Sequence, residues 1–180
     1  MNLDETIFTA LASITHQSNL LDGLIIIFAE YIGYLIAIIW FIVCITRKGW
    51  KERVYVFAVS ALSVIMSWGI ITEGIKHLYE RPRPFVALGM ETLMKFGGYE
   101  SFPSSHMAFF GVLALSVYTL NKKLGTWAII GIIGMGLARI MGGVHWPSDI
   151  IAGAGSAFLS FYSIKLLLTH KGYAQSVRTS

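Results

Sequence analysis

The feature that most constrains the fold of this chain is a series of long apolar segments with almost no charged side chains. Residues 54–72 and 124–138 contain no Asp, Glu, Lys or Arg, and residues 24–46 contain only Glu30. A helix needs about 20 mostly apolar residues to cross the hydrocarbon core of a bilayer, and each segment reaches that length with its flanking residues. We therefore expect five spanning helices, near residues 22–46, 54–78, 104–121, 124–144 and 148–169.

The rest of the chain is too short to form a second domain. Near its start, apolar residues recur at helical spacing at Leu3, Ile7, Leu11 and Ile14. No basic region typical of a cleaved signal peptide accompanies them, so residues 1–21 are predicted as an interfacial amphipathic helix. We predict an all-α fold, a polytopic transmembrane helix bundle that forms a single membrane-embedded domain over residues 1–180, with an outer loop at 79–103. Only 13% of the residues are charged, which excludes an ordinary soluble domain.

The distribution of Lys and Arg predicts the orientation in the membrane, because cytoplasmic loops are enriched in both. One side of the predicted bundle collects Arg47, Lys48, Lys51, Arg53, Lys122, Lys123, Lys171 and Arg178. The other side collects Lys76, Arg81, Arg83, Lys95 and Arg139, together with most of the acidic residues. We predict a multi-pass protein of the cell (inner) membrane in which the first side is cytoplasmic and the outer loop is extracytoplasmic. Orientation and a local site explain the net charge of +4 without a nucleic-acid partner.

Three polar motifs meet at the predicted extracytoplasmic end. The second span ends at KHLYERPRP, the third begins at PSSH, and the turn between the fourth and fifth spans reads ARIMGGVHWPSD. Antiparallel packing brings these helix ends together. The side chains that they contribute are Lys76, Arg83, Ser104, Ser105, His106, Arg139, His145 and Asp149.

This cluster predicts a site for a phosphate group. An ionisable group at the centre of a membrane span costs about 2.5–3.5 kcal/mol, and less near the ends, so a cluster of such groups indicates a function. Cations, histidines and the unpaired N–H groups of a helix start all suit an anion. Taken singly, a cation at a span end is more often an anchor and a serine there is more often a cap. The roles of Arg81, Glu30 and Glu73 stay open.

The three motifs resemble those of the type 2 phosphatidic acid phosphatase superfamily, which also includes the vanadium-dependent haloperoxidases. Its first motif, Lys, six residues and Arg-Pro, corresponds to Lys76, Arg83 and Pro84. Its second motif, Pro-Ser-Gly-His, corresponds to Pro103, Ser104 and His106. Its third motif, Ser-Arg, five residues, His, three residues and Asp, corresponds to Arg139, His145 and Asp149. The chain departs from the family at Ser105, where Gly is usual, and at Ala138, where Ser is usual.

The resemblance implies a role for each matched residue. His145 would attack phosphorus and form a phosphohistidine, with Asp149 accepting a hydrogen bond from the other ring nitrogen. His106 would protonate the leaving oxygen and then activate water. The phosphate oxygens would be held by Lys76, Arg83, Ser104, Ser105 and Arg139. We expect no metal and no cofactor, because fixed cations can stabilise the charge that a metal ion stabilises in other phosphoryl-transfer enzymes.

The short length and the RPRPF and PSSH motifs are most similar to those of bacterial undecaprenyl-diphosphate phosphatases associated with bacitracin resistance. This similarity implies hydrolysis of undecaprenyl diphosphate to undecaprenyl phosphate and phosphate during peptidoglycan synthesis, with a lipid-linked phosphate as substrate and membrane lipids as partners. The sequence leaves open a phosphatase for phosphatidylglycerophosphate or phosphatidate, a lipid phosphotransferase, and a non-catalytic transporter of anionic lipids. It does not determine the oligomeric state, and its hydropathy excludes a soluble haloperoxidase.

Overall fold

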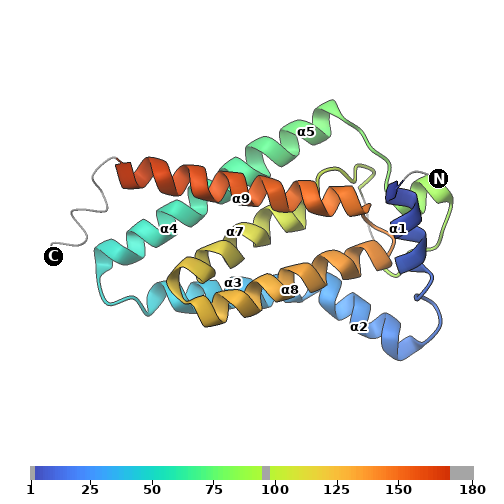
Figure 1. Cartoon of the computed structure of the whole chain (residues 1–180), viewed down its shortest axis with the longest axis horizontal. Helices are drawn as coiled ribbons and strands as arrows, with labels where there is room; N and C mark the ends of the chain where they lie inside the picture. Colours follow the sequence, from blue (N-terminus) through green and yellow to red (C-terminus); the bar gives the residue numbers. More distant parts are fainter. Residues whose placement is uncertain (1–2, 95–97, 171–180) are drawn as a thin grey trace.

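The computed structural model describes residues 3–94 and 98–170, and every regular element in these ranges is a helix (Figure 1). The elements are α1 (Leu3–Ala12), α2 (Asn19–Glu30), α3 (Ile32–Ile45), α4 (Trp50–Val64), the π-helix η1 (Ile65–Thr72), α5 (Glu73–Leu78), α6 (Pro84–Leu88), α7 (Ser105–Leu120), α8 (Lys122–Met141) and α9 (Pro147–His170). The predicted all-α bundle is therefore confirmed. Of the cations used to predict orientation, Lys95, Lys171 and Arg178 lie outside the described residues.

The first predicted span is bent, where we expected one continuous helix. Helices α2 and α3 meet at Tyr31 at an angle of 41°, and together they are long and apolar enough to cross a membrane. The guanidinium of Arg139 donates a hydrogen bond to the carbonyl of Ala29 at this bend, 3.1 Å away. A side chain that binds a carbonyl of the helical ladder is a known cause of such bends. The bend thus comes from a tertiary contact, which helical periodicity does not report.

Within the described residues, three helical segments qualify as spans by themselves. Residues 50–78 form one continuous helix of α4, η1 and α5, and residues 122–141 and 147–169 form α8 and the main part of α9. The predicted span at 104–121 corresponds to α7, which has 16 residues and is shorter than the usual spanning length. The predicted boundaries differ from these by a few residues, as is usual where helix ends are read from hydropathy alone.

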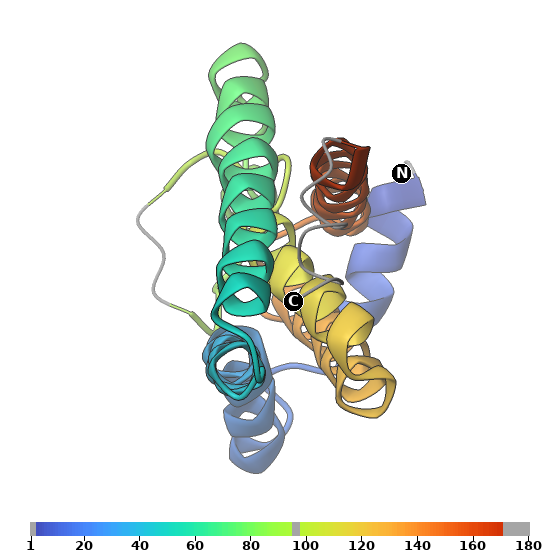
Figure 2. The same ribbon diagram turned by 90° about the vertical axis from the view of Figure 1, so that its left-hand side faces the viewer.

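Helix α7 is the centre of the bundle (Figure 2). It packs against α3, α4, η1, α8 and α9, and most of its side chains are buried. In the view along the bundle, α7 is surrounded by these helices. Because protein surrounds α7, few backbone groups beyond its ends face lipid. A helix shorter than the usual span is therefore tolerated here. The residues at its N-terminal end, Ser104 to His106, are therefore held inside the bundle.

A close contact between α7 and α9 fixes the start of α7. At Gly153 a Cβ atom would lie 2.5 Å from the carbonyl oxygen of Ser104 and 2.9 Å from Cβ of Met107. Neither the backbone of Ser104 nor the Cβ of Met107 can move without shifting α7. Small residues let helices approach closely, and Gly153 does so beside Ser104, one of the predicted site residues.

Helix α1 packs across one end of the bundle, against α8 and α9 (Figure 1). Its Phe8 is fully buried and its ring lies 5.3 Å from that of Trp146. Leu3 and Ile7 remain exposed on the opposite face. That exposed apolar face fits the predicted interfacial position, while the buried face ties α1 to the start of α9.

Candidate active site

All eight predicted site residues lie at the end of the bundle that α1 covers (Figure 1). They come from the last turn of α5, the residue before α6, the start of α7, the end of α8, the turn that leads into α9, and the first turn of α9. They are Lys76, Arg83, Ser104, Ser105, His106, Arg139, His145 and Asp149. Helices far apart in sequence thus bring one set of polar side chains together, as antiparallel packing predicted.

His145 is the centre of the buried part of this cluster. It lies in the turn between α8 and α9, with only 2% of its surface exposed. Its Nδ1 lies 3.4 Å from Oδ2 of Asp149. Its Nε2 lies 3.4 Å from Oγ of Ser104 and 3.5 Å from Nη1 of Arg83. One ring nitrogen therefore faces a carboxylate, while the other faces two groups that could bind a phosphate.

The surroundings favour a neutral His145 imidazole. Burial lowers the pKa of His145 well below its usual range, and the cations of Arg139, Arg83 and Lys76 lower it further, against a backbone hydrogen bond with Ser101 that raises it. A neutral imidazole keeps a lone pair on one nitrogen, which a nucleophile requires.

Arg83 is a buried cation held in one orientation. Its Nε donates to the carbonyl of Gly98 at 2.9 Å, and its Nη1 donates to the carbonyl of Val144 at 2.7 Å. Burial lowers the pKa of Arg83 to about 10, although Asp149 and Glu100 raise it, so the guanidinium stays charged at neutral pH. It supplies fixed positive charge beside Nε2 of His145.

Backbone geometry brings the second and third motifs together. The amide of Ser104 donates to the carbonyl of Asp149 at 3.0 Å, which joins the start of α7 to the first turn of α9. Gly143, two residues before His145, has a φ of 85°, which favours glycine over any residue with a Cβ. This turn ends α8 and directs His145 back toward Ser104.

His106 and Arg139 line a polar cavity of about 360 Å³ with Glu30, Tyr31 and Tyr34. An adjoining cavity of about 500 Å³ is apolar and is lined by Tyr34, Ala37, Trp68, Ser105, His106, Phe109 and Phe110. Both cavities share His106 and Tyr34. His106 thus lies where a polar space meets an apolar one, and it is close enough to interact electrostatically with Arg139, His145, Arg83 and Lys76.

Lys76 and Ser105 form a separate polar cluster with Glu73. The ammonium of Lys76 donates to Oγ of Ser105 and lies 3.3 Å from Oε1 of Glu73. The hydroxyl of Ser105 also donates to Glu73, at 3.3 Å. The serine that stands where the related family has glycine therefore contacts the lysine of the first motif. Lys76 contributes its charge to His145 through space.

Sequence reasoning left one prominent residue of this end unassigned. Arg81 donates hydrogen bonds to Asp149 at 2.8 Å and to Asp4 at 2.7 Å. It could not be distinguished from a membrane anchor because its partners are 68 and 77 residues away in the sequence. The signal in the sequence was its position, two residues before Arg83 in an RPRP motif.

The donor set suits phosphate better than a metal ion. Within residues 3–94 and 98–170, no group of three or more His, Cys, Asp or Glu side chains is arranged to hold a metal ion. Three cations surround the histidines instead, at Lys76, Arg83 and Arg139. Fixed cations and N–H groups are the common means of holding phosphate oxygens in proteins.

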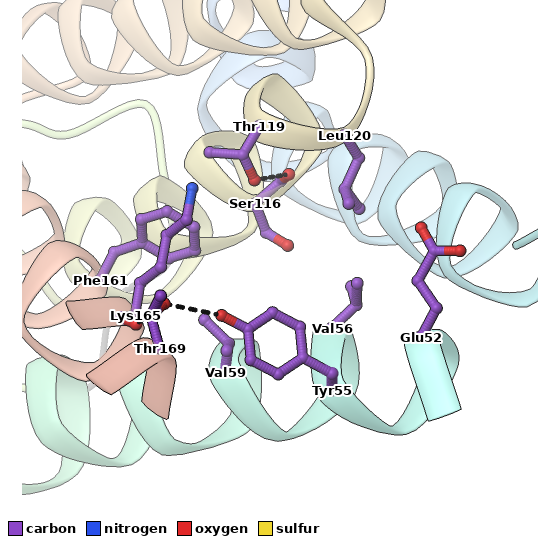
Figure 3. A pocket seen from close by; sticks show the side chains of 10 residues that line it. All are labelled: Glu52, Tyr55, Val56, Val59, Ser116, Thr119, Leu120, Phe161, Lys165 and Thr169. Carbon is purple, nitrogen blue, oxygen red and sulfur yellow. Dashed lines mark hydrogen bonds between the residues drawn. The ribbon is translucent and has the colours of Figure 1, made fainter. Parts of the chain in front are cut away.

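A larger cavity of about 550 Å³ lies at the opposite end of the bundle, between α4, α7 and α9 (Figure 3). Its walls are mostly apolar, with hydrogen bonds between Tyr55 and Thr169 and from the Thr119 hydroxyl to the Ser116 carbonyl. Its charged residues are Glu52 and Lys165, and no histidine lines it. It lacks the residues that a phosphohistidine mechanism needs, so the α1-covered end is the candidate active site.

Comparisons with known proteins identify the family of the chain. A family model described as the PAP2 superfamily matches residues 57–173, which include all eight site residues. Undecaprenyl-diphosphatase BcrC of Bacillus subtilis is 29% identical over 151 residues, which cover 81% of this chain and 74% of the relative. The Bacitracin transport permease protein BcrC of Bacillus licheniformis is 27% identical over 161 residues, which cover 89% of this chain and 77% of the relative.

Solved structures share the fold. The LpxE structure of Aquifex aeolicus has a TM-score of 0.73 and 21% identity, and the match covers 91% of this chain and 95% of that one. A PAP2-type phosphatidylglycerolphosphate phosphatase of Bacillus subtilis has a TM-score of 0.65 and 20% identity, and the match covers 93% of this chain and 87% of that one.

Proposed function

The chain belongs to the PAP2 superfamily and is a membrane lipid phosphatase, and from the geometry of its site we propose that it hydrolyses undecaprenyl diphosphate through a phosphohistidine at His145. The observation that carries this proposal is the set of partners around the two ring nitrogens of His145. Its Nδ1 faces Asp149 and its Nε2 faces Ser104 and Arg83. If Nδ1–H donates to the carboxylate, the lone pair on Nε2 points toward the phosphate-binding groups.

The first step forms a bond between Nε2 of His145 and the terminal phosphorus. The bond from that phosphorus to the bridging oxygen breaks, and undecaprenyl phosphate leaves. His106 donates a proton to the leaving oxygen and is then neutral. In the second step His106 accepts a proton from water, the water oxygen bonds to phosphorus, and the phosphorus–nitrogen bond breaks to release phosphate.

The cations provide the charge stabilisation that phosphoryl transfer requires. Arg83 and Arg139 are buried, with 4% and 0% of their surfaces exposed, so water screens their charges little. Lys76 and Ser105 contact each other, and Ser104 faces His145. We infer that these five residues bind the oxygens of the transferred phosphate.

The two cavities beside His106 fit an amphiphilic substrate. The polar cavity with Glu30 and Arg139 would take the phosphate-bearing end, and the apolar cavity with Trp68 and Phe109 would take the first part of the prenyl chain. We place the bridging oxygen of the diphosphate near the shared boundary of the two cavities at His106. Phosphatidylglycerophosphate and phosphatidate have the same polarity pattern, so they are the competing substrates.

We expect the purified protein to release phosphate from undecaprenyl diphosphate faster than from phosphatidylglycerophosphate or phosphatidate, and equally well in EDTA. The measurement is initial phosphate release over a panel of these lipids in detergent, with and without added acceptor lipid. Hydrolysis without an acceptor would argue against an obligate phosphotransferase. A higher kcat/KM for a glycerophospholipid phosphate would overturn the substrate assignment, and loss of activity in EDTA would overturn the metal-independent mechanism.

We further propose that the site faces the extracytoplasmic side of the cell membrane. The opposite end carries Arg47 and Lys48 in the connection between α3 and α4, and Lys51 and Arg53 at the start of α4, as expected for a cytoplasmic side. The one native cysteine, Cys44, is first replaced by alanine. A cysteine at exposed Leu88 should then react with an impermeant thiol reagent in intact cells. A cysteine at exposed Lys48, on the other side, should react only after lysis. The reverse pattern would place the site in the cytoplasm.

A further inference from the structure

We propose that Asp4 and Arg81 are positioning residues for the reaction, which hold Asp149 and through it the imidazole of His145. This inference rests on the proposed role of His145 as nucleophile. It assigns a role to helix α1, which neither the three motifs nor the matched residues 57–173 include.

Arg81 lies between two carboxylates. Its Nη1 donates to Oδ1 of Asp149 at 2.8 Å and to Oγ of Ser148 at 2.6 Å. Its Nη2 donates to Oδ2 of Asp4 at 2.7 Å. The guanidinium also lies 5.2 Å from the centre of the Trp146 ring. A guanidinium held by two carboxylates and a ring has little freedom to rotate.

Asp149 needs this partner because its carboxylate is fully buried. A buried carboxylate is destabilised unless hydrogen bonds or an opposite charge compensate it. Oδ1 receives the bond from Arg81, and Oδ2 receives the amide of Trp146 at 2.8 Å and faces Nδ1 of His145. Arg81 therefore fixes one oxygen of the carboxylate so that the other is presented to the imidazole.

Asp4 binds the other side of the Arg81 guanidinium. Its Oδ1 accepts from the amide of Ser148 at 2.9 Å, and its Oδ2 accepts from the hydroxyl of the same serine. Burial raises the pKa of Asp4, but hydrogen bonds from Ser148 and Arg81 outweigh this and lower it. The carboxylate is therefore ionised at neutral pH and can balance the second half of the guanidinium.

The packing of α1 supports the same arrangement. Phe8 is one helical turn beyond Asp4 and lies on the same face, against Trp146. The indole of Trp146 donates to the carbonyl of Pro82 at 2.9 Å, next to Arg81. These contacts place Asp4 over the start of α9, so that the series runs from the Asp4 carboxylate to the Arg81 guanidinium, the Asp149 carboxylate and the neutral imidazole of His145.

Asp4 lies outside the phosphate-binding cluster, so its loss should affect the chemical step more than binding. We expect Asp4→Asn to lower kcat about tenfold and to change KM by less than about threefold. Asp4→Glu should recover most of the loss, because it restores the charge. The matched control is Asp22→Asn, which removes another carboxylate that accepts a backbone amide, from His16 at 3.0 Å, and should leave kcat unchanged.

The decisive experiment is a double-mutant cycle on the full-length enzyme. If Asp4 acts through Arg81, Asp4→Asn should have almost no further effect on kcat in an Arg81→Gln background. Ser148→Ala gives a milder version of the test. It removes the hydroxyl that donates to Asp4 and accepts from Arg81, keeps all charges, and should cause a loss of about threefold that disappears in the same background. Equal losses in both backgrounds, or no loss in either, would overturn the proposal.

Single-turnover labelling separates this proposal from the proposed function. With substrate labelled in the terminal phosphate, Asp4→Asn should label His145 about tenfold more slowly than the wild type. If the wild type labels His145 and Asp4→Asn labels it at the same rate, the positioning role is wrong and the nucleophile stands. If the wild type hydrolyses the lipid without labelling His145, both assignments are wrong.

Discussion

Replacement of His145 by alanine should lower the turnover of undecaprenyl diphosphate by about 10⁴-fold or more, because removing a covalent nucleophile removes the whole reaction path. The buried imidazole contacts Asp149, Ser104 and Arg83, so its loss removes the one group that Asp149 orients toward the phosphate-binding side chains. The measurement is kcat on purified protein, with thermal unfolding and size-exclusion profiles to verify folding.

His77→Ala is the matched control for this variant. His77 is an exposed histidine on α5, near the same end of the bundle, and it is one of the six unspecified residues of the first motif. Its replacement should leave kcat within about twofold of the wild type, as expected for a surface substitution. If folded His145→Ala retained substantial turnover, the nucleophile would be another residue. If neither the wild type nor the variant hydrolysed lipid but both transported it, the transporter interpretation of the cluster would be favoured.

Replacement of His106 by alanine should lower turnover by about 10²–10⁴-fold, the usual contribution of a general acid and base. The size of the loss in the first step should depend on the leaving group. Undecaprenyl phosphate leaves as a stabilised anion, whereas a lipid monophosphate must release an alcohol and needs the proton from His106 more. His106 lines both cavities at the point where these leaving groups would lie.

Pre-steady-state kinetics can distinguish the two steps in His106→Ala. With undecaprenyl diphosphate we expect one equivalent of undecaprenyl phosphate to appear quickly, followed by slow turnover, because the phosphohistidine then lacks the base that activates water. With phosphatidate we expect no such burst. A burst of equal size with both lipids, or wild-type turnover with either, would contradict the assignment of both roles to His106.

The bundle and its polar end could be predicted because they are encoded locally. Uncharged runs near the length of a membrane span identify the helices, and the motifs at their ends place Lys76, His106 and His145 on the same side. Each of these signals lies within one short stretch of sequence.

The features that were missed depend on contacts between distant residues. The bend at Tyr31 accompanies the bond from Arg139 to Ala29, across 110 positions. The docking of α1 depends on Asp4, Arg81 and Ser148, with Asp4 and Ser148 144 positions apart. A helical periodicity or a charge count reports neither kind of pairing, so Arg81 resembled a membrane anchor and α1 a purely interfacial helix.

The most direct test of the account is to identify the phosphorylated residue. Wild-type protein should be mixed with undecaprenyl diphosphate labelled in the terminal phosphate, quenched in alkali within one turnover, and mapped by mass spectrometry. We predict an alkali-stable, acid-labile phosphoryl group on His145, absent from His145→Ala and long-lived in His106→Ala. Label on His106 or another residue, or turnover with no labelled protein at any time, would contradict the proposed mechanism.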